Sequence, residues 1–134
     1  MNREVHPEFE STLRRCMGTV PFQTYQPLPD APLPQIVNGI VFVVALWSGP
    51  ALASLTMLRD VLNAYGERPP PLFVVDTDEL PPEAWKALGA TPAGAGETFW
   101  IHGGHVVGRT TGCRRGVAEE MRENTARIYG QAAA

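Results

Sequence analysis

The sequence predicts an α/β protein in which helices flank a mixed central sheet of four or five strands, and three observations lead to this prediction. Residues 40–46 are an unbroken apolar run rich in Val and Ile, as in a strand buried on both faces. A helical apolar period follows over residues 51–66, and a second buried-type strand over residues 72–76. A glycine-centred hairpin over residues 97–109 adds antiparallel strands, which makes the sheet mixed.

The first 35 residues predict elements that precede the central strand. Residues 7–17 form a helix, with acidic residues at its start, arginines at its end and Cys16 on its apolar face. Residues 19–25 suit an edge strand, which tolerates a proline. Residues 26–35 hold four prolines and predict a stiff, extended connector. Such a segment is also a ligand type for aromatic-lined grooves, but the connector interpretation is favoured.

The strand, helix and strand in the middle of the chain predict parallel pairing through a right-handed crossover. A short helix over residues 81–88 follows, closed by Gly89, and a flexible loop over residues 91–96 leads to the hairpin. Gly103 and Gly104 form the hairpin turn, because both central positions of a type I′ turn require positive φ.

Residues 113–129 predict a final helix. Its core face is modest and consists of Val117, Met121, Thr125 and Ile128.

Length, composition and charge indicate an ordinary globular protein. The 134 residues suit one domain, with residues 1–35 as helix and connector and residues 36–130 as the core. A net charge of −3 gives no basic surface for nucleic acid or anionic lipid. The sequence has neither an apolar run of membrane-spanning length nor the apolar region of a signal peptide, so we expect a cytoplasmic protein. Cys16 and Cys113 are expected to be free thiols.

The loop between the first buried strand and its helix reads Trp47-Ser48-Gly49-Pro50-Ala51. It resembles the thioredoxin active-site segment Trp-Cys-Gly-Pro-Cys with both sulfurs removed. From residue 40 onward, over about two-thirds of the chain, the order of elements is also similar to the thioredoxin fold. The resemblance implies a thioredoxin-like three-layer sandwich with its site at the carboxyl end of the central strand.

Departures from the family pattern bear on function. Disulfide exchange needs one thiolate to attack and a second thiol to resolve the mixed disulfide, and this loop has neither. The resemblance implies a cis-proline just before the third strand, where this chain has Gly96 or Glu97; Pro92 lies upstream in a longer loop. A buried acidic residue of the family corresponds to Phe42. We therefore expect a degenerate member without disulfide oxidoreductase activity.

A binding surface uses different atoms from a catalyst and can persist without one. We expect Trp47, Pro50, Gly96 and Glu97 to form a groove that binds a protein or peptide, as in a chaperone-like or scaffold module. This role resembles that of thioredoxin-fold accessory proteins that lack the cysteine pair. One alternative is a thiol-dependent enzyme or glutathione-binding protein that uses Cys113. Another is a self-associating structural protein, a homodimer. No cofactor is expected.

Two side chains near helix starts are candidates for reactivity. Ser48 would be a nucleophile only with a neighbouring base, and its expected role is the N-cap of the following helix. Cys113 is expected at the start of the last helix, followed by Arg114 and Arg115. The helix dipole and the positive charge would both lower the pKa of its thiol, so Cys113 is the cysteine with a case for reactivity.

His102 and His105 flank the glycine turn and are expected to be cross-strand neighbours on one face. Two imidazoles are weak candidates for a metal site, because a site needs three or four ligands. We interpret both histidines as surface residues of the turn.

Overall fold

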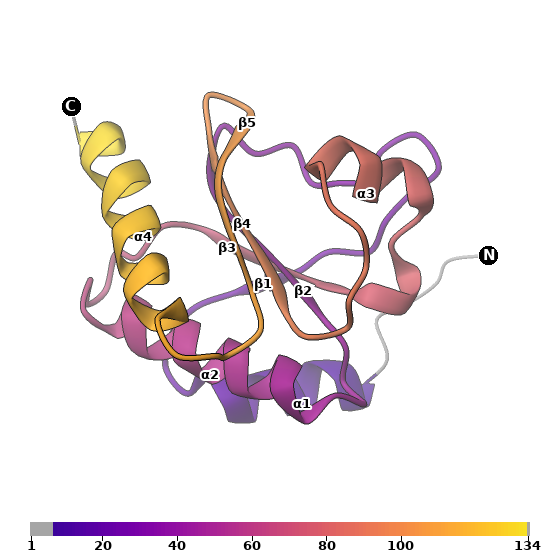
Figure 1. Cartoon of the computed structure of the whole chain (residues 1–134), viewed down its shortest axis with the longest axis horizontal. Coiled ribbons are helices and arrows are strands. Elements are labelled where there is room, and N and C mark those ends of the chain that lie inside the picture. The colour runs from indigo at the N-terminus through magenta and orange to yellow at the C-terminus, as the bar shows by residue number, and fades with distance from the viewer. Residues whose placement is uncertain (1–6, 134) are drawn as a thin grey trace.

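Within residues 7–133, which the computed structural model describes, five strands form one mixed sheet in the order β1-β3-β2-β4-β5 (Figure 1). The elements in chain order are α1 (Pro7–Met17), β1 (Gln23–Thr24), β2 (Asn38–Val44), α2 (Gly49–Asn63), β3 (Leu72–Asp76), the 3-10 turn η1 (Thr77–Glu79), α3 (Pro82–Leu88), β4 (Glu97–His102), β5 (His105–Thr111) and α4 (Val117–Ala133).

β2 is the central strand and pairs on both of its edges. It runs parallel to β3, with Ile40 opposite Leu72, and antiparallel to β4, with Ile40 opposite Trp100. The predicted parallel crossover is therefore confirmed. The hairpin between β4 and β5 is confirmed as well, because Gly103 and Gly104 have φ of 61° and 79°.

Helices cover both faces of the sheet, which gives the expected three layers (Figure 1). Alternate side chains of β2 point to opposite layers. Phe42 belongs to the core cluster that includes residues of α1, α2 and α4, whereas Val41 and Val43 belong to the cluster that includes residues of α3. Both faces of β2 are thus buried, as its continuous apolar run predicts.

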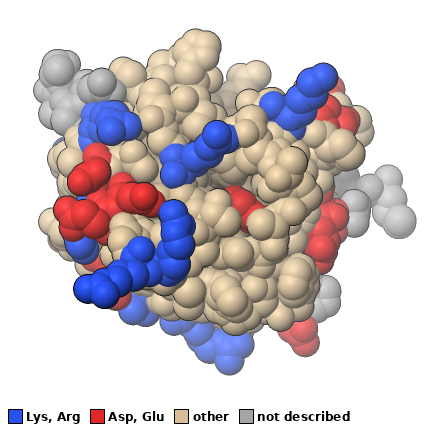
Figure 2. Space-filling model, viewed as in Figure 1, with Lys and Arg blue, Asp and Glu red and all other residues tan. Residues whose placement is uncertain are grey.

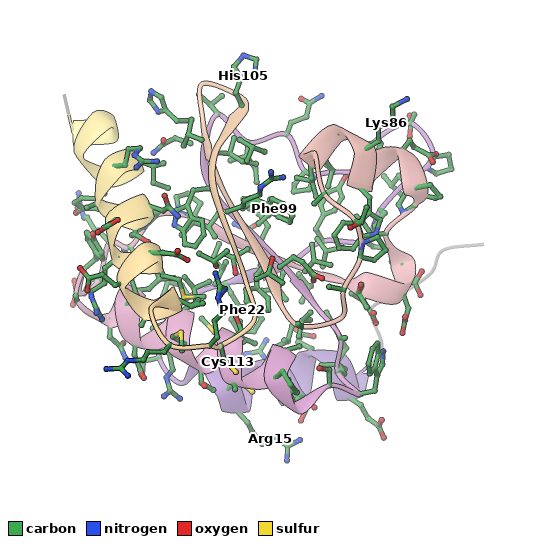
Figure 3. The ribbon with its side chains drawn as sticks, viewed as in Figure 1. Arg15, Phe22, Lys86, Phe99, His105 and Cys113 are labelled. Atoms are coloured by element: carbon green, nitrogen blue, oxygen red, sulfur yellow. The ribbon has the colours of Figure 1, made fainter. Side chains whose placement is uncertain are left out.

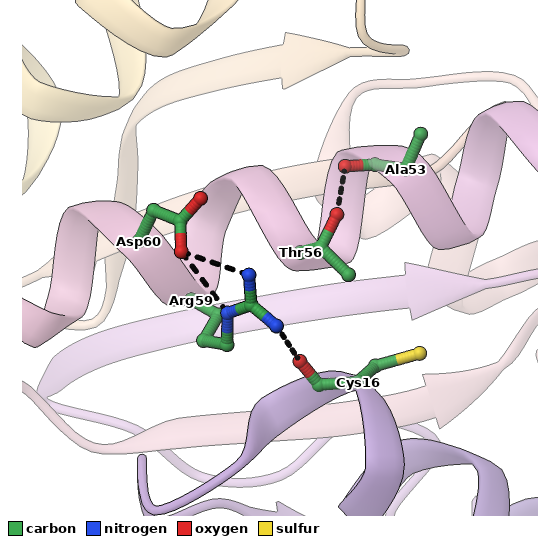
Figure 4. A network of polar contacts seen from close by, with 5 residues as sticks. All are labelled: Cys16, Ala53, Thr56, Arg59 and Asp60. Carbon is green, nitrogen blue, oxygen red and sulfur yellow. Dashed lines mark hydrogen bonds and ion pairs between the residues drawn. The ribbon is translucent and has the colours of Figure 1, made fainter.

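Besides apolar packing in the shared core, a hydrogen bond joins the first helix to the second (Figure 4). Arg59 of α2 donates from Nη1 to the carbonyl oxygen of Cys16, 2.9 Å away, and pairs with Asp60 through Nη2. The carbonyl belongs to the last turn of α1, where carbonyl groups have no partner inside the helix. Cys16 is half-buried against the core, close to the expected apolar position.

The proline-rich connector packs on the α3 side of the sheet. The Tyr25 hydroxyl donates to the carbonyl of Ala31, and Leu33 and Ile36 pack against the cluster that contains Trp85. The predicted edge strand over residues 19–25 is present only as the two residues of β1, which pair in parallel with β3.

The last helix starts later than predicted. α4 begins at Val117 and not at residue 113, because Gly116 has a φ of 94°, which a right-handed helix does not admit. The four residues expected on its core face are buried, and Trp100 Nε1 donates to Thr125 Oγ1 over 2.9 Å. Across the described residues, no helix is both long and apolar enough to cross a membrane.

Candidate functional site

The Trp-Ser-Gly-Pro-Ala loop of the sequence lies at the carboxyl end of the central strand: Trp47 and Ser48 precede α2, and Gly49, Pro50 and Ala51 form its first turn. Its residues differ in accessibility: Trp47 is 70% exposed, Gly49 and Pro50 are exposed, and Ser48 and Ala51 are buried. The two positions that correspond to cysteines in thioredoxin are therefore the two that the fold encloses. The indole is the large exposed apolar group of this segment and is available for contacts with another molecule.

The side chain of Ser48 caps α2. Its Oγ accepts a hydrogen bond from the backbone N–H of Ala51 over 3.3 Å, and Pro50 occupies the first turn, where its missing N–H costs nothing. Among the described residues, no imidazole or carboxylate forms a hydrogen bond with this hydroxyl. The expected N-cap role is confirmed, and the arrangement supplies no base that would make Ser48 a nucleophile.

Gly96 directly precedes β4, the place where the family resemblance implies a cis-proline; no peptide bond in the described chain is cis. Gly96 has a φ of +87°, and a Cβ placed on it would lie 2.8 Å from Ser54 Cβ and 3.1 Å from Phe42 Cζ. The backbone therefore passes closely over the first turns of α2 and over the phenylalanine that corresponds to the family's buried acid. Only a glycine fits this approach.

Glu97, the first residue of β4, is 2% exposed. Its Oε1 accepts hydrogen bonds from the backbone N–H groups of Ala93 and Gly94, at 2.7 and 3.0 Å. These bonds fix the loop that precedes β4. Gly94 in turn lies against the indole, since a Cβ there would be 2.7 Å from Trp47 Cη2. Glu97 thus positions the loop that supports Trp47.

A cavity of about 820 Å³, here called the Trp47 cavity, opens between this loop and α3. Its lining is largely apolar and consists of Trp47, Thr77, Asp78, Leu80, Pro82, Trp85, Lys86 and residues 90–94. The structure therefore separates the four residues expected to form a groove. Trp47 lines the cavity together with Pro92, Pro50 is exposed outside the lining, and Gly96 and Glu97 are buried.

Asp76 ends β3 close to this cavity. Its carboxylate accepts a hydrogen bond from Asp78 N over 2.9 Å and so caps η1. Burial raises the pKa of Asp76 above its ordinary value; the bond from Asp78 N opposes this shift, and the charges of Asp78 and Glu79 add to it.

The two histidines are paired across the hairpin, as expected. Nδ1 of His102 and Oδ1 of Asn38 lie 3.0 Å apart and form a hydrogen bond. His105 is exposed at the hairpin tip (Figure 3). Within the described part of the chain, no group of three His, Cys, Asp or Glu side chains could hold a metal ion.

Cys113 lies in the connection between β5 and α4 and is partly exposed (Figure 3). It precedes the first residue of α4 by four positions, so the prediction that it starts the helix is wrong.

Sequence reasoning did not find two features of this region. Trp85 in α3 and Leu80 just before α3 line the Trp47 cavity, yet both are apolar residues of the kind that also fills a protein core. The role of the Glu97 carboxylate was also missed. A single acidic residue at the start of an apolar strand, after a glycine-rich loop, was the available signal.

Comparison with known proteins gives a likeness in structure only. No protein-family model and no curated protein matches the chain. Among solved structures, oxidized mitochondrial thioredoxin 3 of Saccharomyces cerevisiae matches with a TM-score of 0.56 and 18% identity, over 77% of this chain and 94% of that one. Reduced thioredoxin pre-protein of Schistosoma mansoni matches with a TM-score of 0.52 and 21% identity, over 78% and 97%.

A third structure comes from work on the thiol resolving mechanism of yeast mitochondrial 1-Cys peroxiredoxin via glutathione and thioredoxin systems. It matches with a TM-score of 0.55 and 20% identity, over 77% of this chain and 94% of that one. The sheet order, the helices on both faces and these likenesses agree. The chain has a thioredoxin-like fold.

Proposed function

We propose that this thioredoxin-fold chain is a non-redox module that binds a segment of a partner protein at the Trp47 cavity, in a chaperone-like or scaffold role. The observation that carries the proposal is an indole that is 70% exposed beside an apolar cavity of about 820 Å³. Exposed tryptophans next to concave apolar surfaces are common anchors of protein interfaces. The free cysteines Cys16 and Cys113 accord with a reducing compartment, and we place the function in the cytoplasm.

The chemistry of the loop favours binding over catalysis. A dithiol cycle needs a thiolate at the position of Ser48 and a second thiol at the position of Ala51, and these residues supply a capping hydroxyl and a buried methyl group. The apolar lining suits an apolar side chain of the partner. Asp78 and Lys86 line the same cavity and supply a negative and a positive charge, which can contact polar groups of the partner segment on either side of that apolar side chain.

The experiment captures partners from a lysate of the source cell with three baits: the wild type, Trp47→Ala and the control Val37→Ala. Val37 is 76% exposed and precedes β2, whereas Trp47 follows it, so the control removes an exposed apolar side chain at the other end of the strand. Captured proteins are identified by mass spectrometry, and the affinity of the bound segment is measured for each bait.

We expect Trp47→Ala to weaken binding of that segment by roughly thirtyfold or more, the effect of losing a central aromatic anchor, and Val37→Ala to leave it unchanged. Equal affinity for the wild type and Trp47→Ala, or equal losses in both variants, would contradict the proposal. Insulin disulfide reduction by the wild-type chain above the background rate would contradict the non-redox assignment.

A further inference from the structure

A second cavity, here called the Glu97 cavity, adjoins the Trp47 cavity and shares Lys86, Ala90, Thr91 and Ala93 with it. It has a volume of about 570 Å³ and is lined by Lys86, Gly89, Ala90, Thr91, Ala93, Glu97, Phe99, Arg109 and Thr111. Figure 3 shows Lys86 on α3 and Phe99 on the sheet, the two walls between which this cavity opens. Trp47 does not line it.

Its negative group is the carboxylate of Glu97. Oε1 is occupied by the two loop N–H groups, but Oε2 is buried and has no hydrogen-bond partner among the described residues. A buried polar oxygen without a hydrogen-bond partner is costly, and a cationic donor brought against it would recover much of that cost.

The positive groups of the cavity are Lys86 and Arg109. Arg109 donates from Nη1 to the carbonyl of Gly89, and neither side chain forms an ion pair within the described part of the chain. Both side chains are exposed at the cavity mouth, while Glu97 lies at its buried end. The cavity therefore presents unpaired charges of opposite sign at its two ends.

The separation of these charges comes from the sheet register. Glu97 is opposite Thr111 and Phe99 is opposite Arg109, so Glu97 and Arg109 lie diagonally on one face, positions about 7–8 Å apart. Their charged atoms are not within the 4.0 Å of an ion pair. The rest of the lining includes the ring of Phe99 and the methyl groups of Ala90 and Ala93, together with Thr91 and Thr111.

From these observations we propose that the Glu97 cavity binds a small amino carboxylate. The ammonium group contacts the Glu97 carboxylate, the ligand's carboxylate pairs with Arg109 and Lys86, and the methylene chain packs on Phe99. Because the charges of the cavity are further apart than an ion-pair distance, the ligand separates its own charges by several bonds. γ-Aminobutyrate has this form and is the probe we would use.

The test is a titration of the full chain, labelled with nitrogen-15, followed by NMR. The amides of Ala93 and Gly94 report on the Glu97 end, and the Nε–H of Arg109 reports on the mouth. Butylamine and butyrate are matched probes that each lack one charge. We expect one saturating curve at both ends with γ-aminobutyrate, and binding roughly tenfold or more weaker for each single-charge probe, since one charge-assisted contact is lost.

Two variants complete the test. Arg109→Gln removes the cation at the mouth and is expected to weaken γ-aminobutyrate binding roughly tenfold or more, while Arg122→Gln removes an exposed arginine of α4 and leaves binding unchanged. Glu97→Gln is expected to abolish binding; because that change also touches the loop, Arg109→Gln and the single-charge probes decide whether the proposal holds.

No saturable shift with γ-aminobutyrate, equal affinity for all three probes, or wild-type affinity in Arg109→Gln would each overturn the proposal. The absence of a saturable shift would also be expected if Arg109 and Glu97 formed an ion pair in solution, because that pair would close the cavity.

Discussion

Three residues near the carboxyl ends of β2 and β3 have roles set by their immediate surroundings. Ser48 caps α2, Asp76 caps η1, and Glu97 fixes the loop before β4. The first role could be predicted from the sequence, because a serine before Gly-Pro at a helix start is a local signal. The role of Glu97 could not, since its two hydrogen bonds depend on how the preceding loop folds back.

Asp76→Asn tests the effect of burial on this carboxyl group. Because the folded state raises the pKa of Asp76, it holds the proton more tightly than the unfolded chain does, and the free energy of unfolding falls as pH rises through the interval between the two pKa values. Asparagine does not titrate and still accepts the bond from Asp78 N. We expect the variant to be more stable relative to wild type at about pH 7 than at about pH 3, where the carboxyl group is largely protonated in both the folded and the unfolded chain.

Urea unfolding of both proteins at the two pH values measures this difference. Asp30→Asn removes an exposed carboxyl group of the connector and serves as the control. The free energy of unfolding of Asp76→Asn relative to wild type could instead stay constant or rise toward low pH. That result would show that burial does not determine the direction of the Asp76 pKa shift.

The boundaries of helices and strands could be predicted where a residue type by itself determines the backbone conformation. The turn at Gly103 and Gly104 was predictable because positive φ at both positions is a property of glycine itself. The predicted start of α4 at residue 113 was wrong because the helix was taken to begin directly after Gly112, whereas Gly116 has a positive φ and the helix begins after it. Arg114 and Arg115 were a further signal, since cations are unfavourable at a helix N-terminus.

Gly96→Ala tests the contact between the pre-β4 loop and α2. Alanine there meets both the penalty of a positive φ and a Cβ only 2.8 Å from Ser54 Cβ. Gly104→Ala, in the hairpin turn, has a similar φ of +79° and no atom within 4 Å of its Cβ, so it measures the backbone penalty alone.

We expect Gly96→Ala to lower the free energy of unfolding by at least about 1 kcal/mol more than Gly104→Ala does, because packed neighbours must move. Thermal or urea unfolding of the two variants gives the comparison. Equal losses would mean that the loop relaxes away from α2 without cost.

The whole molecule distributes its three tryptophans unequally between core and surface. Trp47 is 70% exposed, Trp85 is 5% exposed and Trp100 is fully buried. The thioredoxin-like order of elements could be inferred from strand and helix patterns, and an accessible Trp47 was expected from its place in the loop. The burial of Trp85 and Trp100 could not be read in the same way, because it depends on how the helices pack on the sheet. On the face in Figure 2, acidic and basic side chains are interspersed.

Quenching of tryptophan fluorescence measures this distribution. We expect acrylamide to quench one component of the emission readily and the rest weakly, and Trp47→Ala to remove the readily quenched component, because only that indole is open to solvent. The variant Trp85→Phe, which changes a core residue, should retain the readily quenched component. A readily quenched component that survives in Trp47→Ala would show that the α3 layer opens in solution.

The position of β2 in the sheet has a consequence for how the chain folds during its synthesis. β2 pairs with β4 on one of its edges, so the central strand stays half-paired until residues 97–102 have been synthesised and can pair with it. During that time a long apolar strand has an open edge, the kind of surface on which nascent chains aggregate. We expect truncations that end before β4 to need chaperone protection, because the open edge of β2 has no partner strand in them.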